Sequence, residues 1–158
     1  MADNDRDTFE DAFNLLCGDR IGYGMSRQVF ECALLPGYVV KVEKDPMHTW
    51  QNIMEWKTWG IVESTSASRW FAECRWISPG GRILIQERTR PAGLADFPDR
   101  VPLWFTDLKR QNWGMAKSQR KDGAAGKEWL VCHDYGTCLA LQDGTSTKRM
   151  KKAEWYDA

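Results

Sequence analysis

Apolar positions change their spacing along the chain, and each change predicts a different element. Residues 8–17 carry apolar side chains at i, i+3, i+4 and i+7, which predicts a short amphipathic helix. Two β-rich runs follow at residues 28–34 and 38–43, and the Pro-Gly turn between them predicts a hairpin. The apolar face of the first helix consists of Phe9, Ala12, Phe13 and Leu16.

A second helix and a second pair of strands are expected in the middle of the sequence. Asp45-Pro46 supplies a cap and a first turn for a helix that ends near Glu63. Strands are expected at residues 71–78 and 82–88, and the three prolines of residues 89–102 predict an irregular connector that leaves the sheet. The apolar stripe of this helix consists of Trp50, Ile53, Met54 and Ile61.

The last third of the sequence predicts short strands and long polar segments. Strand-like pieces around residues 113–115 and 129–133 flank a Gly/Lys-rich loop, residues 117–128, that is expected to project into solvent. From Thr145 onward the sequence predicts a final basic helix. The chain shows no internal repeat and no second boundary, so residues 1–158 are expected to form one domain.

Composition and charge narrow the class of protein. The 158 residues are 42% hydrophobic and 28% charged, which is the balance of an ordinary globular domain. Lys plus Arg and Asp plus Glu each number 22, so no global positive field recruits nucleic acid or an anionic membrane. The polar start is unlike a signal peptide, and no run approaches the ~20 apolar residues of a membrane span. We therefore expect a cytoplasmic protein without a nucleic-acid or membrane partner.

Cysteine and tryptophan usage raises two further questions. The five cysteines are odd in number and lack a C-x-x-C pair, which predicts reduced, mostly buried thiols rather than disulfides or a zinc site. The nine tryptophans would suit stacking on nucleic-acid bases, but proteins that bind in that way pair aromatic residues with a basic groove. In a chain of zero net charge we favour tryptophan as core and surface anchor.

The candidate chemistry lies in five motifs. The glycine loop Gly22-Tyr23-Gly24-Met25-Ser26-Arg27 links two expected strands, and Val39-Val40-Lys41-Val42 lies in the next strand. Glu55 lies within the second helix, and Asp107-Leu108-Lys109-Arg110-Gln111-Asn112 and Asp134-Tyr135-Gly136 complete the series. In this order the motifs resemble those of the protein-kinase-like superfamily, and most of all its compact bacteriophage and bacterial members. For a phage-encoded protein the expected location is the host cytoplasm.

The resemblance implies a fold and also shows where the chain departs from the family. It implies an α+β fold with a five-stranded antiparallel N-lobe sheet and one main helix over about residues 7–88. A much reduced C-lobe is expected over residues 89–158. The 22 residues after Gly136 are too few for a full activation segment and a large helical lobe. Phe105-Thr106 replaces the family's H-R before Asp107, so regulation by activation-loop phosphorylation is not expected.

The glycine loop has two interpretations. Taken alone, two glycines between strands also suit an ordinary hairpin turn. In the family the loop backbone covers the phosphates of ATP, and Arg27, at the position of the third glycine, is expected to be able to contact one. The implied nucleotide-binding residues are Gly22, Gly24, Ser26, Arg27, Val29, Val39, Lys41 and Glu87.

A lysine and a glutamate are the expected ion pair of the site. Strand alternation places Val39, Lys41 and Glu43 on one face, where the resemblance assigns Lys41 to the α- and β-phosphates and Val39 to the adenine. Glu55 is the implied counter-charge for Lys41, and its alternative role is that of a solvated helix charge. Glu63, at the end of the helix, is a less favoured partner.

The last two motifs imply the catalytic and metal-binding groups. By resemblance, Asp107 orients the attacking hydroxyl and accepts its proton, and Lys109 contacts phosphate. Asn112 and Asp134 are the implied ligands of Mg²⁺, because amide and carboxylate oxygens suit this hard cation. The implied cofactors are ATP and Mg²⁺, and the catalytic set consists of Asp107, Lys109, Lys41 and Glu55.

Three functions fit these residues. The first is a Mg-ATP phosphotransferase of the protein-kinase type that acts on Ser or Thr of a protein. The second is a nucleotide-binding pseudokinase that binds or inhibits a protein partner, for which an exposed Trp155 would suit the contact surface. The third transfers phosphate to a small molecule or to the protein itself, because a reduced C-lobe leaves the γ-phosphate side open.

Overall fold

A five-stranded antiparallel sheet forms the first half of the molecule. A computed structural model describes residues 2–45, 50–117 and 127–157. The strands are hydrogen-bonded in the order β1-β2-β3-β5-β4, and every pair is antiparallel. The predicted α+β fold with a five-stranded antiparallel sheet is confirmed. The strands are β1 (Cys17–Tyr23), β2 (Arg27–Cys32), β3 (Tyr38–Glu43), β4 (Cys74–Ile77) and β5 (Ile83–Glu87).

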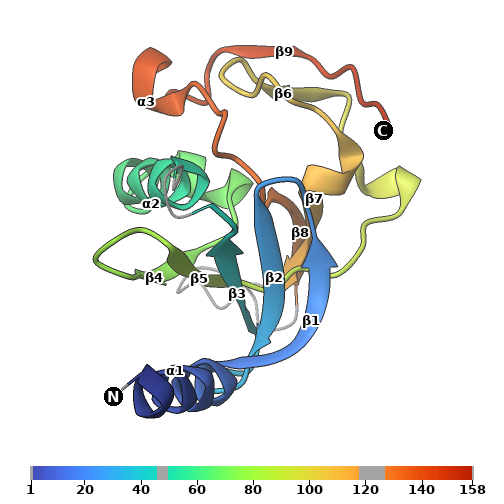
Figure 1. The fold of residues 1–158 in the computed structure, drawn as a ribbon. Coiled ribbons are helices and arrows are strands. Elements are labelled where there is room, and N and C mark those ends of the chain that lie inside the picture. Colours follow the sequence, from blue (N-terminus) through green and yellow to red (C-terminus); the bar gives the residue numbers. More distant parts are fainter. Residues whose placement is uncertain (1, 46–49, 118–126, 158) are drawn as a thin grey trace.

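Two helices accompany this sheet (Figure 1). α1 (Ala2–Leu16) runs directly into β1, and Phe13 packs edge-on against Phe30 of β2 with ring centroids 5.2 Å apart. α2 (Trp50–Val62) follows β3 and packs on β3, β4 and β5. α2 therefore lies beside β3, the strand that carries Lys41.

Alternation along β3 divides its side chains between two environments. Val40 is fully buried in an apolar cluster with Cys17 and Cys32, on the side of the sheet that meets α1. Lys41 and Glu43 are also buried, but they face α2, where Asn52 donates its backbone N–H to Glu43. The predicted placement of Lys41 and Glu43 on one face is confirmed.

The buried face of α2 differs from the predicted apolar stripe. Trp50 is 65% exposed and Ile61 is 39% exposed, so the stripe does not face the core. The helix buries polar side chains instead, because Arg27 and Lys41 pair with them as described below. Its buried residues are Asn52, Glu55, Thr58, Trp59 and Val62.

Short strands dominate the second half of the chain. β6 pairs with β9 and β7 with β8, each pair antiparallel. Figure 1 shows these two ribbons beyond the five-stranded sheet, with β9 running toward the C-terminus. The loop predicted to project into solvent falls mostly on residues 118–126, outside the described residues. The elements are β6 (Arg100–Pro102), β7 (Trp113–Lys117), β8 (Glu128–Cys132), α3 (Ala140–Asp143), β9 (Met150–Lys152) and three 3₁₀ turns at Ser66–Trp70, Leu94–Asp96 and Arg110–Asn112.

The basic helix predicted after Thr145 is wrong. The helical turn α3 lies earlier, and the basic run Met150–Lys152 forms strand β9 beside β6. The half-buried Met150 packs against the main core. The run has no repeating apolar face that would stabilise a helix, whereas β6 offers it backbone hydrogen bonds.

Aromatic side chains fill the main core. Phe71 is fully buried and stacks on Trp104, and its ring centroid lies 4.8 Å from that of Tyr135. All five cysteines are buried and free, as predicted. Four tryptophans are buried (Trp59, Trp70, Trp104 and Trp113), which agrees with their expected role as core anchors.

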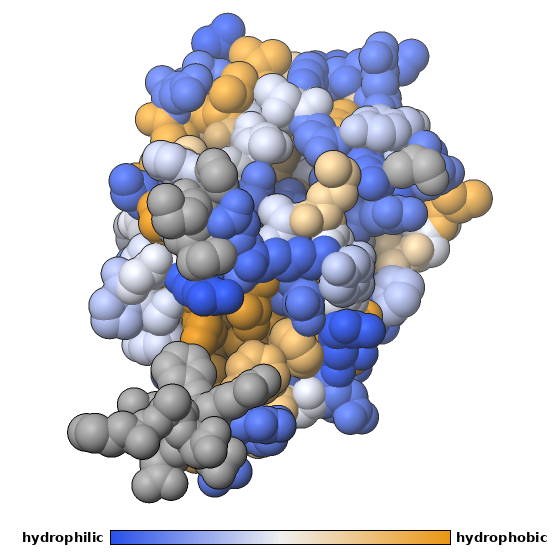
Figure 2. Space-filling model, viewed as in Figure 1, coloured by the Kyte–Doolittle hydropathy of each residue, from blue (hydrophilic) through white to orange (hydrophobic). Residues whose placement is uncertain are grey.

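Polar and apolar side chains share the surface of the molecule (Figure 2). Figure 2 shows mainly polar side chains on this face, with apolar residues in separate groups. Within the described parts of the chain, no helix is long and apolar enough to cross a bilayer.

Candidate functional site

Glu55 is the centre of the site and accepts four hydrogen bonds. The carboxylate is completely buried, and its Oε2 lies 3.1 Å from Lys41 Nζ. Gln86 Nε2 donates to the same oxygen, at 3.3 Å. The other oxygen, Oε1, accepts from Arg27 at 2.8 Å and from the backbone N–H of Tyr135 at 3.2 Å. The structure brings together the predicted Lys41–Glu55 pair, whereas Glu63 is exposed at the end of α2.

Two cations keep this buried carboxylate ionised. Burial alone would raise the pKa of Glu55, but the charges of Arg27 and Lys41 outweigh it and lower the pKa to about 2. Lys41 Nζ also donates to the backbone carbonyl of His133, just before the Asp134-Tyr135-Gly136 motif. The ion pair therefore links β3, α2 and this motif.

Arg27 lies at the start of β2 and points into the site. Its guanidinium is buried and donates to Glu55, to Asn52 Oδ1 at 3.1 Å and to Asp134 Oδ1 at 2.9 Å. The two carboxylates raise the pKa of Arg27 against the effect of burial, so it stays charged. These contacts use three of the five N–H groups that a guanidinium offers, so the phosphate contact expected from the sequence would have to use the other two.

Two buried amides support the cluster and were missed in the sequence. Asn52 is fully buried, and its Nδ2 donates to the backbone carbonyls of Lys41 and Arg82 at 3.2 and 2.9 Å. Gln86, at the end of β5, holds Glu55 as described above. A helix amide facing inward carries no sequence signal, because the apolar period pointed to the opposite face of α2.

Asp134-Tyr135-Gly136 lies against α2. Tyr135 is buried, and its hydroxyl donates to the carbonyl of Ala72 at 2.8 Å. Its backbone N–H binds Glu55, which fixes the preceding Asp134 beside Arg27. The Asp134 side chain keeps 46% of its surface exposed, so solvent and ligands reach it.

His133, whose backbone carbonyl accepts from Lys41, has a neutral imidazole. Its Nε2 lies 2.9 Å from the carbonyl of Gln111, which can only accept, so Nε2 carries the proton. Nδ1 then accepts from the hydroxyl of Thr89, 2.8 Å away. Burial and the nearby Lys41 charge lower the pKa of His133 to about 4.

Asp107 accepts hydrogen bonds from three donors. Its Oδ1 accepts from the backbone N–H of Lys109 at 3.1 Å and from the hydroxyl of Tyr156 at 2.6 Å, and its Oδ2 accepts from Asn112 Nδ2 at 3.0 Å. Tyr156 was missed because it lies 49 residues from Asp107 in the sequence. The loop is buttressed by Phe105, whose buried ring lies 4.6 Å from that of Trp113.

A cavity of about 340 Å³ lies between the sheet and the second half of the chain. Its wall includes most of the predicted nucleotide-binding residues, whereas Gly24 and Ser26 lie on the exposed loop above it. Gly22 packs closely on Val29, since a Cβ on Gly22 would lie 3.3 Å from that of Val29. The predicted residues on the wall are Gly22, Val29, Val39, Lys41 and Glu87.

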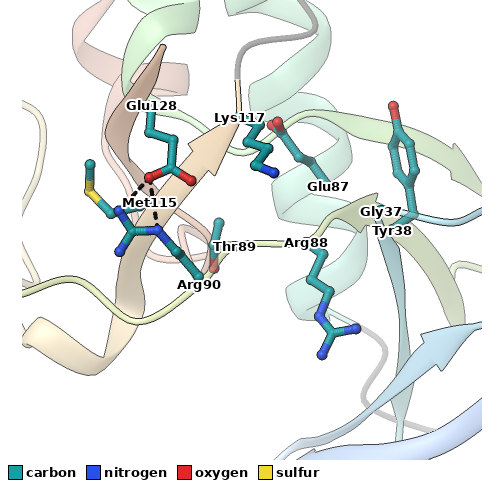
Figure 3. A pocket seen from close by; sticks show the side chains of 9 residues that line it. All are labelled: Gly37, Tyr38, Glu87, Arg88, Thr89, Arg90, Met115, Lys117 and Glu128. Atoms are coloured by element: carbon teal, nitrogen blue, oxygen red, sulfur yellow. Dashed lines mark hydrogen bonds and ion pairs between the residues drawn. The ribbon is translucent and has the colours of Figure 1, made fainter. Parts of the chain in front are cut away.

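A second hollow of about 310 Å³ lies on the other side of the linker that follows β5 (Figure 3). It runs from Tyr38 to Lys117, and an ion pair between Arg90 and Glu128 lies on the side away from Tyr38. Glu87 also lines this hollow, but Lys41 does not, and Asp134 lines neither of the two cavities. We therefore place the candidate site in the cavity beside Lys41.

The chemistry of Asn112 and Asp134 fits Mg²⁺. Both His133 and Asp134 donate their backbone N–H to the Asn112 carbonyl, at 2.9 and 3.3 Å, which brings the backbones of Asn112 and Asp134 together. An amide and a carboxylate are ligands that Mg²⁺ accepts when phosphate oxygens and water complete its shell. The described residues contain no group of three His, Cys, Asp or Glu side chains that could hold a metal ion, so phosphate and water would have to supply the remaining ligands.

Comparison with known proteins does not assign a family. No family model matches the sequence, and no curated protein matches it. Among solved structures, the ternary complex of streptomycin, ATP and APH(2")-IIa is similar over 58% of this chain, with 19% sequence identity and a TM-score of 0.41. The match spans only 31% of that chain. A likeness of this size carries no conclusion about activity, so function rests on the geometry of the site.

Proposed function

We propose that this protein is an ATP- and Mg²⁺-dependent phosphotransferase of the kinase-like type. The observation that carries the proposal is the Lys41–Glu55 ion pair, buried in a cavity wall and bonded to the segment that holds Asp134. Phosphoryl transfer depends mainly on positioning and electrostatic stabilisation, and it requires this ion pair and the aspartate together.

The residues divide the work as follows. Val29 and Val39 offer an apolar wall for a base, and Lys41, held by Glu55, faces the same cavity with its charge. Asn112 and Asp134 would hold Mg²⁺, which neutralises the charge of the phosphates when bound. Asp107 orients an acceptor hydroxyl and takes its proton. As acceptor we propose serine or threonine of a protein.

A pseudokinase is the second candidate, and two contacts favour it. Arg27 occupies an oxygen of Asp134, and Tyr156 occupies an oxygen of Asp107. Both groups must be released or shared before Asp134 binds a metal and Asp107 binds an acceptor. A protein that never releases them would bind nucleotide without transferring phosphate, and would act through a protein partner.

Labelled ATP distinguishes these functions. The purified protein is incubated with γ-labelled ATP and Mg²⁺, alone and with cell lysate, beside Asp134→Ala and the control Asp143→Ala on the exposed surface of α3. Labelled protein bands in the wild type and the control, lost in Asp134→Ala, support the phosphotransferase. Metal-dependent thermal stabilisation by ATP without transfer supports the pseudokinase. Absence of any ATP effect contradicts both.

A further inference from the structure

The C-terminal segment, residues 153–157, lies along the catalytic loop, residues 107–112, and makes an isolated parallel β-bridge to it between Tyr156 and Lys109. Tyr156 donates its backbone N–H to Leu108 at 3.2 Å and accepts from Arg110 at 2.9 Å, which places it parallel to the loop. Asp157 adds an ion pair to Arg110, 3.0 Å long. The end of the chain is therefore held in a defined register against the residues that surround Asp107.

Trp155 anchors this segment. Its indole N–H donates to the carbonyl of Pro98 at 2.8 Å, and its ring packs edge-on against Phe97 and Trp113 with centroids 4.9 and 5.1 Å apart. The expectation of an exposed Trp155 is therefore wrong, because the side chain is half-buried in the main core. Since neighbouring residues of an extended chain point to opposite sides, an anchored Trp155 turns Tyr156 toward Asp107.

The hydroxyl of Tyr156 has the position that an acceptor needs. It lies 2.6 Å from Asp107 Oδ1, within the range over which a general base takes a proton. The hydrogen bond to Asp107 raises the pKa of Tyr156, so the phenol keeps its proton until a base removes it. The residue is 48% exposed, which leaves room for a phosphate donor to approach it.

We propose that Tyr156 is an intramolecular phosphate acceptor, phosphorylated by the catalytic loop on which it lies. This inference rests on the proposed phosphotransferase function. The phenolic oxygen forms a bond to the γ-phosphorus of ATP while the bond from that phosphorus to the bridging oxygen of ADP breaks. Asp107 takes the phenolic proton, and ADP leaves.

Phosphorylation has a structural consequence for the segment. The new phosphate carries about −1.5 to −2 charge at pH 7 and stands beside the carboxylate of Asp107. Like charges at hydrogen-bond distance repel, so the phosphorylated segment leaves the loop and exposes Asp107 to other hydroxyl groups. The protein would thus open its own acceptor site in its first turnover.

The test uses the full chain, Mg²⁺ and ATP without any other acceptor, with Tyr156→Phe and the matched control Tyr38→Phe in β3. Mass spectrometry locates the phosphate, and ADP formation is followed in the same reaction. We expect phosphate on Tyr156 in the wild type and in Tyr38→Phe, at a rate per molecule that does not depend on protein concentration. Tyr156→Phe should lose at least tenfold of the incorporation.

Two other outcomes overturn the inference, and they differ. Formation of ADP or labelling of other residues, with Tyr156 unmodified, shows that the phosphotransferase exists and that Tyr156 only covers its site. Absence of both ADP and nucleotide binding shows that the proposed function itself is wrong, and the inference fails with it.

A readout without nucleotide checks the release of the segment. The backbone amide at position 156 should exchange its hydrogen at least tenfold faster in Tyr156→Glu than in the wild type, because glutamate adds a negative charge beside Asp107. Equal protection in both proteins would contradict the release.

Discussion

At the scale of single residues, the site depends on the carboxylate of Glu55, which is completely buried. Glu55 is stabilised by two cations and two further donors, and each of them comes from a different part of the chain. Removal of one partner from a buried ion pair costs more than the pair contributes, because the remaining charge stays buried. Substitutions around Glu55 should therefore affect stability as well as function.

Arg27→Met should lower the free energy of unfolding by about 3–5 kcal/mol. The substitution leaves Glu55 with Lys41 alone and frees Asp134 from its ion pair. Urea denaturation measures the loss. Arg88→Met is the matched control, because Arg88 pairs with Glu31 at 2.7 Å on the surface, where such a pair contributes about 0–1 kcal/mol. An equal loss of unfolding free energy in the two variants would show that the Arg27 ion pairs contribute no more to stability than a surface pair does.

His133 should make stability depend on pH below about 6.5. Its pKa falls from 6.5 to about 4 on folding, so the unfolded chain binds the extra proton in that interval. The free energy of unfolding should fall by on the order of 3 kcal/mol as the pH drops from about 6.5 toward 4. Glu55, with a folded pKa of about 2 against 4.5, adds a further loss below pH 4.5.

His133→Gln should separate the two effects. Glutamine keeps a donor and an acceptor but does not titrate, so the loss between pH 6.5 and 4.5 should disappear while the loss at lower pH remains. Denaturation curves recorded at a series of pH values show both. A wild-type stability that stays flat from pH 6.5 to 4.5 would refute the assignment of a neutral His133.

The sequence was informative about residues with a motif and silent about those without one. Lys41 and Glu55 were predicted as a pair, because a strand lysine and a helix glutamate keep their places in the motif order. The inward direction of Arg27 and the contact of Tyr156 with Asp107 depend on the tertiary fold. No local pattern records a contact between residues 107 apart, as between Arg27 and Asp134.

At the scale of elements, the linker after β5 and strand β7 approach each other so closely that there is no space for a side chain at position 114. Arg90 and Met115 exchange backbone hydrogen bonds of 2.9 Å, and a Cβ on Gly114 would lie 2.8 Å from the Arg90 carbonyl oxygen. Glycine at this position thus lets β7 join the linker that borders both cavities.

Gly114→Ala should lower the free energy of unfolding by about 1–3 kcal/mol, because the methyl group must push two backbone segments apart. Gly60→Ala provides a control of opposite sign. Gly60 is an exposed helix residue with nothing within 4 Å of an added Cβ, so alanine should stabilise α2 by about 0.5–1 kcal/mol. Thermal and urea unfolding of both variants measure these changes, and a stabilising Gly114→Ala would contradict the close approach.

Element types were easier to predict than element faces. Four strands of the sheet were identified by their β-rich runs and Pro-Gly turns, and β3 has the predicted bounds, whereas β1 was expected only from the resemblance and the glycine loop. The inner face of α2 and the strand β9 were missed, because partners distant in sequence determine them: buried cations for α2, and an open edge of β6 for β9.

At the scale of the whole molecule, the two halves meet through the proposed site. Lys41, Arg27 and Glu55 come from the sheet and α2, and they bind His133, Asp134 and Tyr135 of the second half. A ligand that binds this cluster therefore contacts both halves and should stabilise the folded chain as a unit, by an amount that follows its concentration over its Kd.

The central claim is that this cluster binds a nucleoside triphosphate, and calorimetric titration with ATP in the presence and absence of Mg²⁺ tests it most directly. We compare the wild type with Lys41→Met and with the control Lys57→Met on the exposed side of α2. Lys41→Met should still fold, because Arg27 continues to neutralise Glu55. We predict Mg²⁺-dependent binding of ATP. The affinity should weaken roughly 10- to 100-fold in Lys41→Met, because one charged hydrogen bond is lost, and stay unchanged in Lys57→Met. Binding that is equal in all three proteins, or absent from the wild type, would contradict the account.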